Sequence, residues 1–439
     1  MRLFKPPCGL GLFPDDVLVE ILCRLPEKPL ARLKCVCKSW DYLISVFCLP
    51  RVSLPLCGLF FRTYALPPHM PLITTDASDS SRDAFYSNLQ SPDNGELIDY
   101  VSVEGNSGIG DGGGGGGCVD SEFLVNLPFH STCAHDFLDS CNGLFLFFNA
   151  SDCRYYVCNP VMRQYVPIPK ARCHQTYCYA ALAFNPSESL CYRVVRFAQP
   201  LKERKLLLDI YSSDTELWVR HLVQIDSCLN ERIWITPSVY FDGALYRLSL
   251  SWHLLRFDLN KVGVRAIELP LTESGRLTVI GCIGVFMGRL CYAKKDSFWL
   301  FIWSLEEDCK AMEWTLKYNI CMVNLVMDMV RSKGYDLDYL LWFLPFAFHP
   351  ISDVIFLSVP LGILSYDLKR TRLEEVYKPR DGVIIDGHFY QAFTCIRFLV
   401  SLNHLGKIHS RPTQLTSISQ HTKVLSLEMP PDEIPNGGA

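Results

Sequence analysis

A loose repeat in residues 123–402 restricts the fold of this chain more than any other feature. Each copy has an apolar run with an aromatic residue near its end, a short polar turn, and a second run that often carries an aromatic residue. The first runs begin at Tyr155, Leu208, Leu254, Leu300 and Ile363, and they lead to Tyr165, Trp218, Val264, Trp314 and Leu373. Short apolar runs separated by polar turns are typical of β-strands joined by hairpins. We therefore expect an all-β domain.

The spacing of the copies favours a β-propeller. It is irregular, but it lies near the roughly 40–50 residues that one blade needs. A single four-stranded blade cannot bury both of its faces, so several blades must stack around an axis, which also protects the sheet edges. We predict about six blades, closed by a last strand within residues 389–402 that returns to the first blade. A β-sandwich or two smaller β domains is the alternative.

Residues 13–47 show a different pattern, with apolar side chains at helical spacing in three short groups. Asp15 and Asp16 stand where acidic side chains stabilise the first turn of a helix, and the first group ends at Pro26. Pro29 suits the first position of a second helix, because proline has no N–H to lose there. The third group places four apolar residues on one side of a helix: Trp40, Leu43, Ile44 and Phe47.

These three predicted helices are too few to bury a core of their own. A unit of about 40 residues is at the lower limit for independent folding, so another protein or the neighbouring domain should cover part of it. Helical spacing alone favours the plain core of a small bundle. The ordered combination of Pro14, Arg24-Leu25-Pro26, Val36-Cys37 and Trp40 reverses that preference, because helix packing alone does not require it. The unit is therefore interpreted as a docking module.

At these residues the sequence resembles the F-box family, whose members recruit substrates to Skp–cullin–RING ubiquitin ligases. Phe13 and Pro29 depart from the family pattern, which usually has Leu and a small polar residue at these places. The resemblance implies contact with a Skp-family adaptor, and through it with cullin and RING subunits. The residues implied in adaptor contact are Phe13, Pro14, Leu18, Ile21, Leu22, Leu25, Leu30, Val36 and Trp40. Trp40 is also expected to hold the helices together.

Five phrases in the strand-rich region resemble the F-box-associated domain of a large plant F-box group, whose kelch-like repeats form a propeller. They begin at Asp139, Tyr156, Leu182, Asp242 and Phe346. Where this group tends to have Trp after Gly-Ala-Leu-x, the chain has Arg247, so that blade is expected to pack differently. The resulting fold class is α+β multidomain, a three-helix F-box followed by an all-β, kelch-like propeller.

Composition divides the chain into four expected parts. Residues 10–50 form the F-box, and residues 51–122 contain a strand segment and a linker rich in Ser, Asp and Gly, with glycine at every position from 112 to 117. Low-complexity segments of this kind are typical of flexible linkers. Residues 123–402 form the propeller, and residues 403–439 form a polar tail.

Charge and hydropathy exclude several classes of partner. The net charge of −4 lacks the basic excess that nucleic-acid binding needs. Lys5, Pro6 and Pro7 interrupt the amino-terminal segment, which makes it a poor signal peptide. The apolar run at residues 337–348 is too short to span a bilayer. We expect no nucleic acid and no membrane partner, and a cytoplasmic or nuclear location.

The sequence suggests neither a metal site nor a catalytic site. Its 20 cysteines are spread along a long chain without a secretory signal, so reduced thiols are expected. Cys173, His174 and Cys178 come nearest to a metal cluster, but no second ligand pair follows at zinc-finger spacing. The sequence has no G-x-S-x-G or H-E-x-x-H motif. No catalytic residue, metal or other cofactor is therefore expected.

A binding function should use the loops at one end of the propeller. Trp252 and His253 lie between two apolar runs, near a predicted hairpin tip where an exposed aromatic side chain could hold a partner. Packing of Trp252 under a neighbouring loop is an equal alternative. Tyr177, Tyr179 and Trp234 are further candidates of the same kind.

The function expected from these features is recruitment of an unknown target protein to a Skp–cullin–F-box ubiquitin ligase, with no catalysis by this chain. Two rival functions remain open. The chain could be an interaction scaffold without a ligase role, or a propeller enzyme with an appended helical domain.

Overall fold

The computed structural model describes most of the chain up to Gly406. The described residues are 15–51, 55–65, 96–103, 127, 137–171, 179–197, 205–224, 237–249, 252–272, 281–307, 312–333, 342–360, 362–380, 382–385, 387 and 391–406. Phe13, Pro14, Tyr177 and Trp234 lie outside these ranges, as do Cys173, His174 and Cys178.

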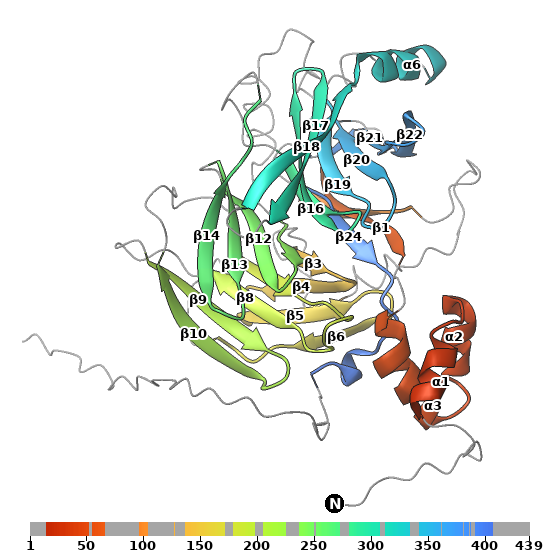
Figure 1. Ribbon diagram of the computed structural model, residues 1–439, viewed down its shortest axis with the longest axis vertical. Helices are drawn as coiled ribbons and strands as arrows, with labels where there is room; N and C mark the ends of the chain where they lie inside the picture. Colours follow the sequence, from red (N-terminus) through yellow and green to blue (C-terminus); the bar gives the residue numbers. More distant parts are fainter. Residues whose placement is uncertain are drawn as a thin grey trace, which may run out of the picture. The chain divides into compact units, whose positions relative to one another are not determined.

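Six four-stranded sheets follow the amino-terminal helices, and they confirm the predicted six-bladed propeller (Figure 1). Blade 1 contains β3 (Phe137–Cys141), β4 (Leu144–Asn149), β5 (Arg154–Asn159) and β6 (Gln164–Pro167). Blade 2 contains β7 (Tyr179–Ala183), β8 (Arg193–Phe197), β9 (Lys205–Ser212) and β10 (Leu217–Gln224). Blade 3 contains β11 (Val239–Phe241), β12 (Ala244–Ser249), β13 (His253–Asp258) and β14 (Gly263–Glu268).

Blades 4 and 5 continue this order. Blade 4 contains β15 (Gly281–Phe286), β16 (Arg289–Asp296), β17 (Trp299–Glu307) and β18 (Met312–Cys321). Blade 5 contains β19 (Leu344–Phe348), β20 (Val354–Val359), β21 (Gly362–Asp367) and β22 (Arg372–Tyr377). Each of these sheets is an antiparallel meander of strands that are consecutive in the chain.

Blade 6 combines two strands that precede blade 1 with two strands that follow blade 5. Its central strand β1 (Leu56–Ala65) pairs with β2 (Glu96–Ser102) on one edge, and on the other with β23 (Val383–Ile385) and β24 (Phe393–Ile396). The ring closes where Ser140 Oγ donates to the Thr394 carbonyl oxygen at 3.2 Å, which links blade 6 to blade 1. The boundary expected at residue 123 is therefore corrected, because β1 and β2 are propeller strands. The closing strand, β24, pairs with β1 in blade 6 and not with a strand of blade 1.

The sequence repeat corresponds to the hairpin between the third and fourth strands of blades 1 to 5. An Asp or Asn at the end of the third strand accepts backbone N–H groups of the turn in three of them. These residues are Asn159, Asp258 and Asp367. The corresponding turns of blades 1, 2, 3 and 5 contain a non-glycine residue with positive φ, at Arg163, Glu216, Val262 and Thr371. Short polar side chains that bond to the backbone two or three residues ahead are typical of tight turns.

Three short helices precede the propeller. They are α1 (Asp15–Leu22), α2 (Glu27–Leu33) and α3 (Lys38–Leu43), and α3 continues through η1 (Ile44–Cys48) and η2 (Leu49–Arg51). The second helix begins at Glu27 and not at Pro29 as expected. Pro29 still costs little, because the N–H groups of a first helical turn have no partner within the helix.

One helix was not expected in the strand-rich region. The segment after β18 forms α6 (Val323–Lys333), in which Val326 and Met329 are buried against blades 4 and 5. In the described ranges, every helix is too short or too polar to cross a bilayer.

Candidate functional site

The two ends of the propeller differ in the turns that they carry. In a four-stranded antiparallel blade, the turns after the first and third strands lie at one end of the ring, and the turn after the second strand lies at the other. The F-box contacts the first of these ends. Ser187 Oγ, in the β7–β8 connection, donates to the Pro50 carbonyl oxygen at 3.0 Å. We name this end the F-box end and the opposite end the far end.

The F-box keeps part of its apolar surface exposed. Ile21 on α1 is 49% exposed and Val36, between α2 and α3, is 60% exposed. Val17, one helical turn before Ile21, is 42% exposed. Exposed aliphatic side chains on a small module favour contact with a partner. Ile21 and Val36 are two of the residues that the sequence assigned to adaptor contact.

The other predicted adaptor residues that the structure describes are less accessible. Leu22 and Leu30 are 2% and 0% exposed, so the structure assigns them to the packing of the module. Adaptor contact at these two positions stays a prediction that their burial does not favour. Leu18, Leu25 and Trp40 are half-buried and pack against the same core. For Trp40 this placement agrees with its expected role between the helices.

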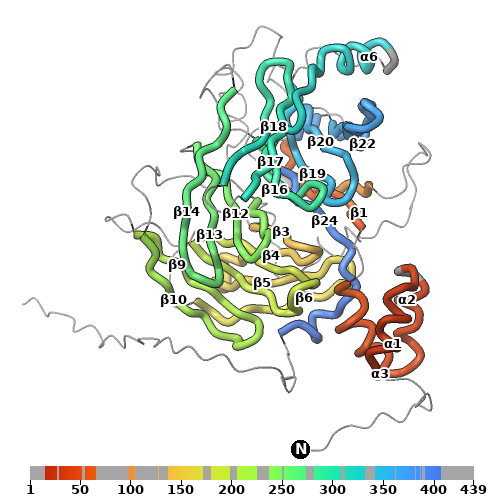
Figure 2. The backbone as a smooth tube through the Cα atoms, in the orientation of Figure 1, coloured from red at the N-terminus to blue at the C-terminus, as the bar shows by residue number. Residues whose placement is uncertain are grey.

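The core of the F-box continues into the propeller. Val19, Leu22, Leu30 and Ile44 belong to one hydrophobic cluster with buried residues of blades 1 and 2. The segment that follows β24 joins the two sets of residues, and we name residues 397–406 the C-terminal strap. Its side chains Phe398, Val400, Leu402 and Leu405 are all buried in this cluster. Figure 2 shows the strap passing beside the F-box helices.

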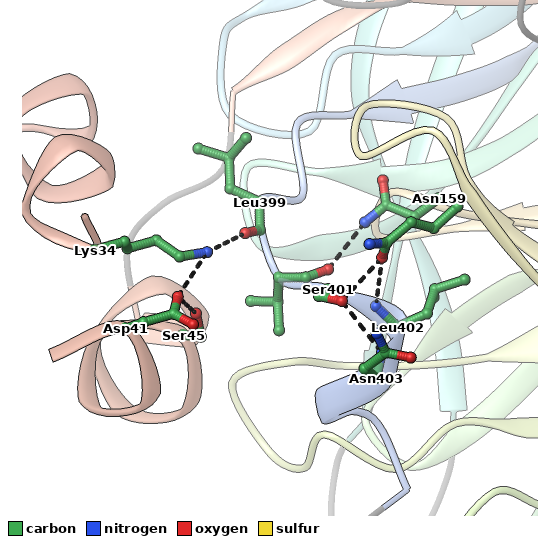
Figure 3. Close-up of polar contacts among 10 residues, drawn as sticks. Lys34, Asp41, Ser45, Asn159, Leu399, Ser401, Leu402 and Asn403 are labelled. Atoms are coloured by element: carbon green, nitrogen blue, oxygen red, sulfur yellow. Dashed lines mark hydrogen bonds and ion pairs between the residues drawn. The ribbon is translucent and has the colours of Figure 1, made fainter. Parts of the chain in front are cut away.

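Polar contacts hold the strap from both sides (Figure 3). On the propeller side, Asn159 Nδ2 donates to the carbonyl oxygens of Phe398 at 3.0 Å and Val400 at 3.1 Å. On the F-box side, Lys34 Nζ donates to the Leu399 carbonyl oxygen at 3.3 Å. The expected tail boundary at residue 403 is therefore corrected, because η4 (Leu402–His404) and Leu405 belong to the packed domain.

The far end carries the predicted target-binding residues that the structure describes. Trp252 stands at the tip of the β12–β13 hairpin with φ of 65°, as its position between two apolar runs predicted. Its ring is half-buried, packs against the core of blades 3 and 4, and lies 4.9 Å from Lys294 Nζ. His253 follows it as the first residue of β13. Trp252 thus combines packing with partial exposure, and its contact with a partner stays a prediction.

Tyr179 begins β7 at the same end and is 44% exposed. The Arg247 guanidinium lies 5.9 Å from the centre of its ring and 5.0 Å from the Phe197 ring. Arg247 is completely buried, and burial lowers its pKa to about 10. Arg247, which stands where the related group tends to have tryptophan, therefore joins blade 3 to blade 2.

Asp139 joins the inner strands of three blades. Its carboxylate accepts N–H groups from Ser140 in blade 1, Leu182 in blade 2 and Ser238 at the start of blade 3. Burial raises its pKa to about 7, although these donors and Arg247 favour the charged form.

Gln391 bridges blades 6 and 4, because Nε2 donates to the Gly281 carbonyl oxygen and Oε1 accepts from the Ile283 N–H.

A cavity of about 100 Å³ lies along the propeller axis, between inner strands of blades 1, 3, 4, 5 and 6. Its lining includes Ser140, Asn142, Ser238, Cys282 and Thr394. Binding pockets for small organic ligands usually have volumes of about 300–1,000 Å³, so this cavity suits water or a single side chain. Among the residues that the structure describes, no three His, Cys, Asp or Glu side chains converge as metal ligands.

Several residues of these surfaces were missed at the level of sequence. Phe298 and Trp299, 45% and 42% exposed, lie at the β16–β17 turn of the far end. Their position after Asp296-Ser297 and between two apolar runs could have indicated a hairpin tip. The burial of Asp139 and Arg247 and the contacts of the strap left no comparable signal, because their partners are distant in the chain.

Comparison with known proteins agrees with this architecture. Residues 121–381 match the family described as F-box protein At3g26010-like, beta-propeller, and residues 10–51 match the F-box domain. The propeller match covers more than half of the chain. The chain belongs to this family of F-box proteins with a β-propeller, as the two resemblances predicted.

Relatives from Arabidopsis thaliana align over much of their length. F-box protein At5g07610 is 24% identical over 88% of this chain and 91% of its own. F-box/kelch-repeat protein At3g23880 is 24% identical over 69% of this chain and 78% of its own. A chain of the crystal structure of the mitotic checkpoint complex, 10% identical, covers 56% of this chain and 78% of its own with a TM-score of 0.32, too low to indicate a shared fold.

F-box proteins with a propeller generally act as substrate receptors of Skp–cullin–F-box ligases, and their F-box generally binds a Skp-type adaptor. They are typically adaptors and not enzymes.

Proposed function

We propose that this chain is the substrate-recognition subunit of a Skp–cullin–F-box ubiquitin ligase. The F-box binds a Skp-type adaptor, and the far end of the propeller binds a target protein. The chain itself performs no catalysis. Its contribution is proximity, because tethering raises the effective concentration of target lysines near the charged conjugating enzyme.

The exposed apolar residues of the F-box carry this proposal. Most of its other apolar side chains are buried or half-buried in the cluster that the F-box shares with the propeller, whereas Ile21 and Val36 remain about half exposed or more. An aliphatic side chain that stays exposed beside a large buried core is available to a second polypeptide. Val17 lies one turn from Ile21 on α1 and extends the same available surface.

Adaptor binding by charged variants tests the proposal. Ile21→Glu and Val36→Glu, together or singly, should weaken binding of a purified Skp-type adaptor about 100-fold, because they place a charge in an apolar interface. Val219→Glu is the matched control, since Val219 is 50% exposed on the outer strand β10 of the propeller. Isothermal calorimetry measures the affinities. Equal binding by all the variants would count against the proposal.

The target side needs a cellular measurement. Proximity labelling with and without proteasome inhibition should show at least one far-end partner that accumulates or loses ubiquitin when the chain is removed. Partners whose abundance and ubiquitination do not change would favour the scaffold function instead. We further propose a cytoplasmic or nuclear location, which imaging of a fluorescent fusion would test.

A further inference from the structure

The C-terminal strap is attached to the propeller at several points along its length. It begins where the Arg397 N–H donates to the Pro55 carbonyl oxygen at 2.9 Å, so the chain enters and leaves blade 6 at the same place. Asn159 then holds Phe398 and Val400. Gln164 Oε1 accepts from the Leu402 N–H at 2.9 Å and from Ser401 Oγ at 3.0 Å. The Gly406 N–H donates to the Leu190 carbonyl oxygen at 3.2 Å.

The strap also fills the space between the propeller and the F-box. Phe398 is 0% exposed, and its ring meets the Phe184 ring of blade 2 edge-on at 5.2 Å. Gly143 lies against it, and a Cβ atom there would stand 2.5 Å from the Phe398 Cβ. On the opposite side Leu399 packs against the shared cluster, and its carbonyl oxygen accepts from Lys34.

These contacts give the F-box more than one attachment to the propeller. A single covalent connection before β1 would allow the small module to rotate about that connection. The strap adds a hydrogen bond that it accepts from Lys34 of the F-box, and it adds a shared apolar core. Ser187 adds a hydrogen bond to the Pro50 carbonyl oxygen. Two packed bodies held at separate points cannot rotate without breaking buried contacts.

We infer that the C-terminal strap is a positioning element that fixes the orientation of the F-box on blades 1 and 2. It sets the direction in which the far end of the propeller points from the adaptor, and so selects the lysines that the conjugating enzyme reaches. Asn159, Gln164 and Lys34 are the positioning residues that hold it. The consequence for ubiquitin transfer rests on the proposed ligase function, whereas the mechanical coupling does not.

Asn159→Asp tests the coupling with minimal change in shape. Aspartate keeps the oxygen that accepts the Met162 N–H in the β5–β6 turn, but it replaces the amide that donates to the strap. Asp367→Asn is the matched control, because Asp367 makes the equivalent turn in blade 5, away from the strap. Lys34→Met releases the strap from the F-box side by an independent route.

Hydrogen exchange of the full-length protein measures the result. Asn159→Asp should raise exchange of the amides of residues 398–406 about tenfold or more, while the inner strands of the propeller keep their protection. Lys34→Met should raise exchange in η1 and at Leu399, and Asp367→Asn should leave the strap unchanged. Unchanged protection of the strap and of η1 in both Asn159→Asp and Lys34→Met would overturn the inference.

A reconstituted ligase tests the consequence. With a Skp-type adaptor, cullin, RING subunit and conjugating enzyme, the wild-type chain should be ubiquitinated on a restricted set of its own propeller lysines, mapped by mass spectrometry. Asn159→Asp should bind the adaptor within about twofold of wild type and spread modification over additional lysines. An unchanged lysine pattern would overturn the positioning role. Failure of the wild-type chain to bind the adaptor would instead refute the proposed function.

Discussion

The two ends of the propeller use the same hairpin architecture for opposite purposes. At the F-box end, turns of blades 1 and 2 pack against the strap and the helices, and residues such as Leu144, Phe184 and Phe398 are almost fully buried. At the far end, Tyr179, Phe298 and Trp299 keep over two fifths of their surface exposed. The part of the F-box end that the strap covers is therefore an extension of the core, whereas the far end presents Tyr179, Phe298 and Trp299 to solvent.

This difference shows how a ring of similar blades comes to have two distinct ends. Every blade has turns at both ends, so the fold alone does not decide which end binds a partner. Attachment of the F-box covers blades 1 and 2 at one end and leaves the other end available. Mutations at the F-box end should thus act on stability and orientation, and mutations at the far end should act on target binding.

Two phenylalanines, one at each end, give the largest expected contrast. Phe398→Ala removes a fully buried ring from the strap and should lower the free energy of unfolding by about 3–5 kcal/mol. Phe298→Ala removes a ring that is 45% exposed and should cost below about 1 kcal/mol. Urea denaturation of the two variants measures both values. Similar losses would contradict the assignment of one end to the core.

The pH dependence of stability tests the contribution of Asp139, which joins inner strands of the propeller. The pKa of Asp139 is about 7 in the folded chain and 3.8 ordinarily, so the folded state binds a proton more tightly. Its contribution to stability is complete below about pH 4 and is lost as the pH rises through 7, on the order of 2–4 kcal/mol. Asp139→Asn cannot titrate and should lack this slope in denaturation curves measured from pH 4 to 8. The same slope in both proteins would show that another group is responsible.

Two glycines separate backbone strain from contact with the strap. Gly143 and Gly243 have φ of 87° and 72° in equivalent turns of blades 1 and 3, so alanine is strained at both. A Cβ at Gly143 would also collide with Phe398, whereas at Gly243 it would meet only the Asn260 side chain at 3.4 Å. Gly143→Ala should therefore cost about 1–2 kcal/mol more than Gly243→Ala in thermal unfolding. Equal costs would mean that the strap yields easily at this point.

The smallest expected effect on stability is at the far end. Trp299→Ser should change the free energy of unfolding by less than about 1 kcal/mol and leave adaptor affinity unchanged. It should nevertheless reduce recovery of the target proteins identified by proximity labelling. Leu316→Ser is the control, because Leu316 is 47% exposed on β18 and lies away from the turns. Loss of the targets in both variants would place recognition on the side of blade 4 and not at its tip.

Local patterns were sufficient for much of the fold. Helical spacing located α1 and α3 closely, and the runs that begin at Leu254 and Ile363 coincide with β13 and β21 and their hairpins. Such elements are specified by neighbours in the chain, through side-chain period and turn chemistry. The same local information placed Trp252 at a hairpin tip. The resemblance to the F-box family, and not a local pattern, gave Ile21 and Val36 as adaptor candidates.

The amino-acid sequence by itself thus predicted the short amino-terminal helices, the repeated hairpins and the six blades that the structure contains. Only the tertiary structure decided that β1 and β2 complete blade 6, that Leu22 is buried while Ile21 is exposed, and that the strap joins the two domains. The physical reason is the distance along the chain between partners. A helical period or a strand alternation shows that one face will be covered, but the covering residue, such as Phe184 for Phe398, is chosen by packing between segments that are far apart.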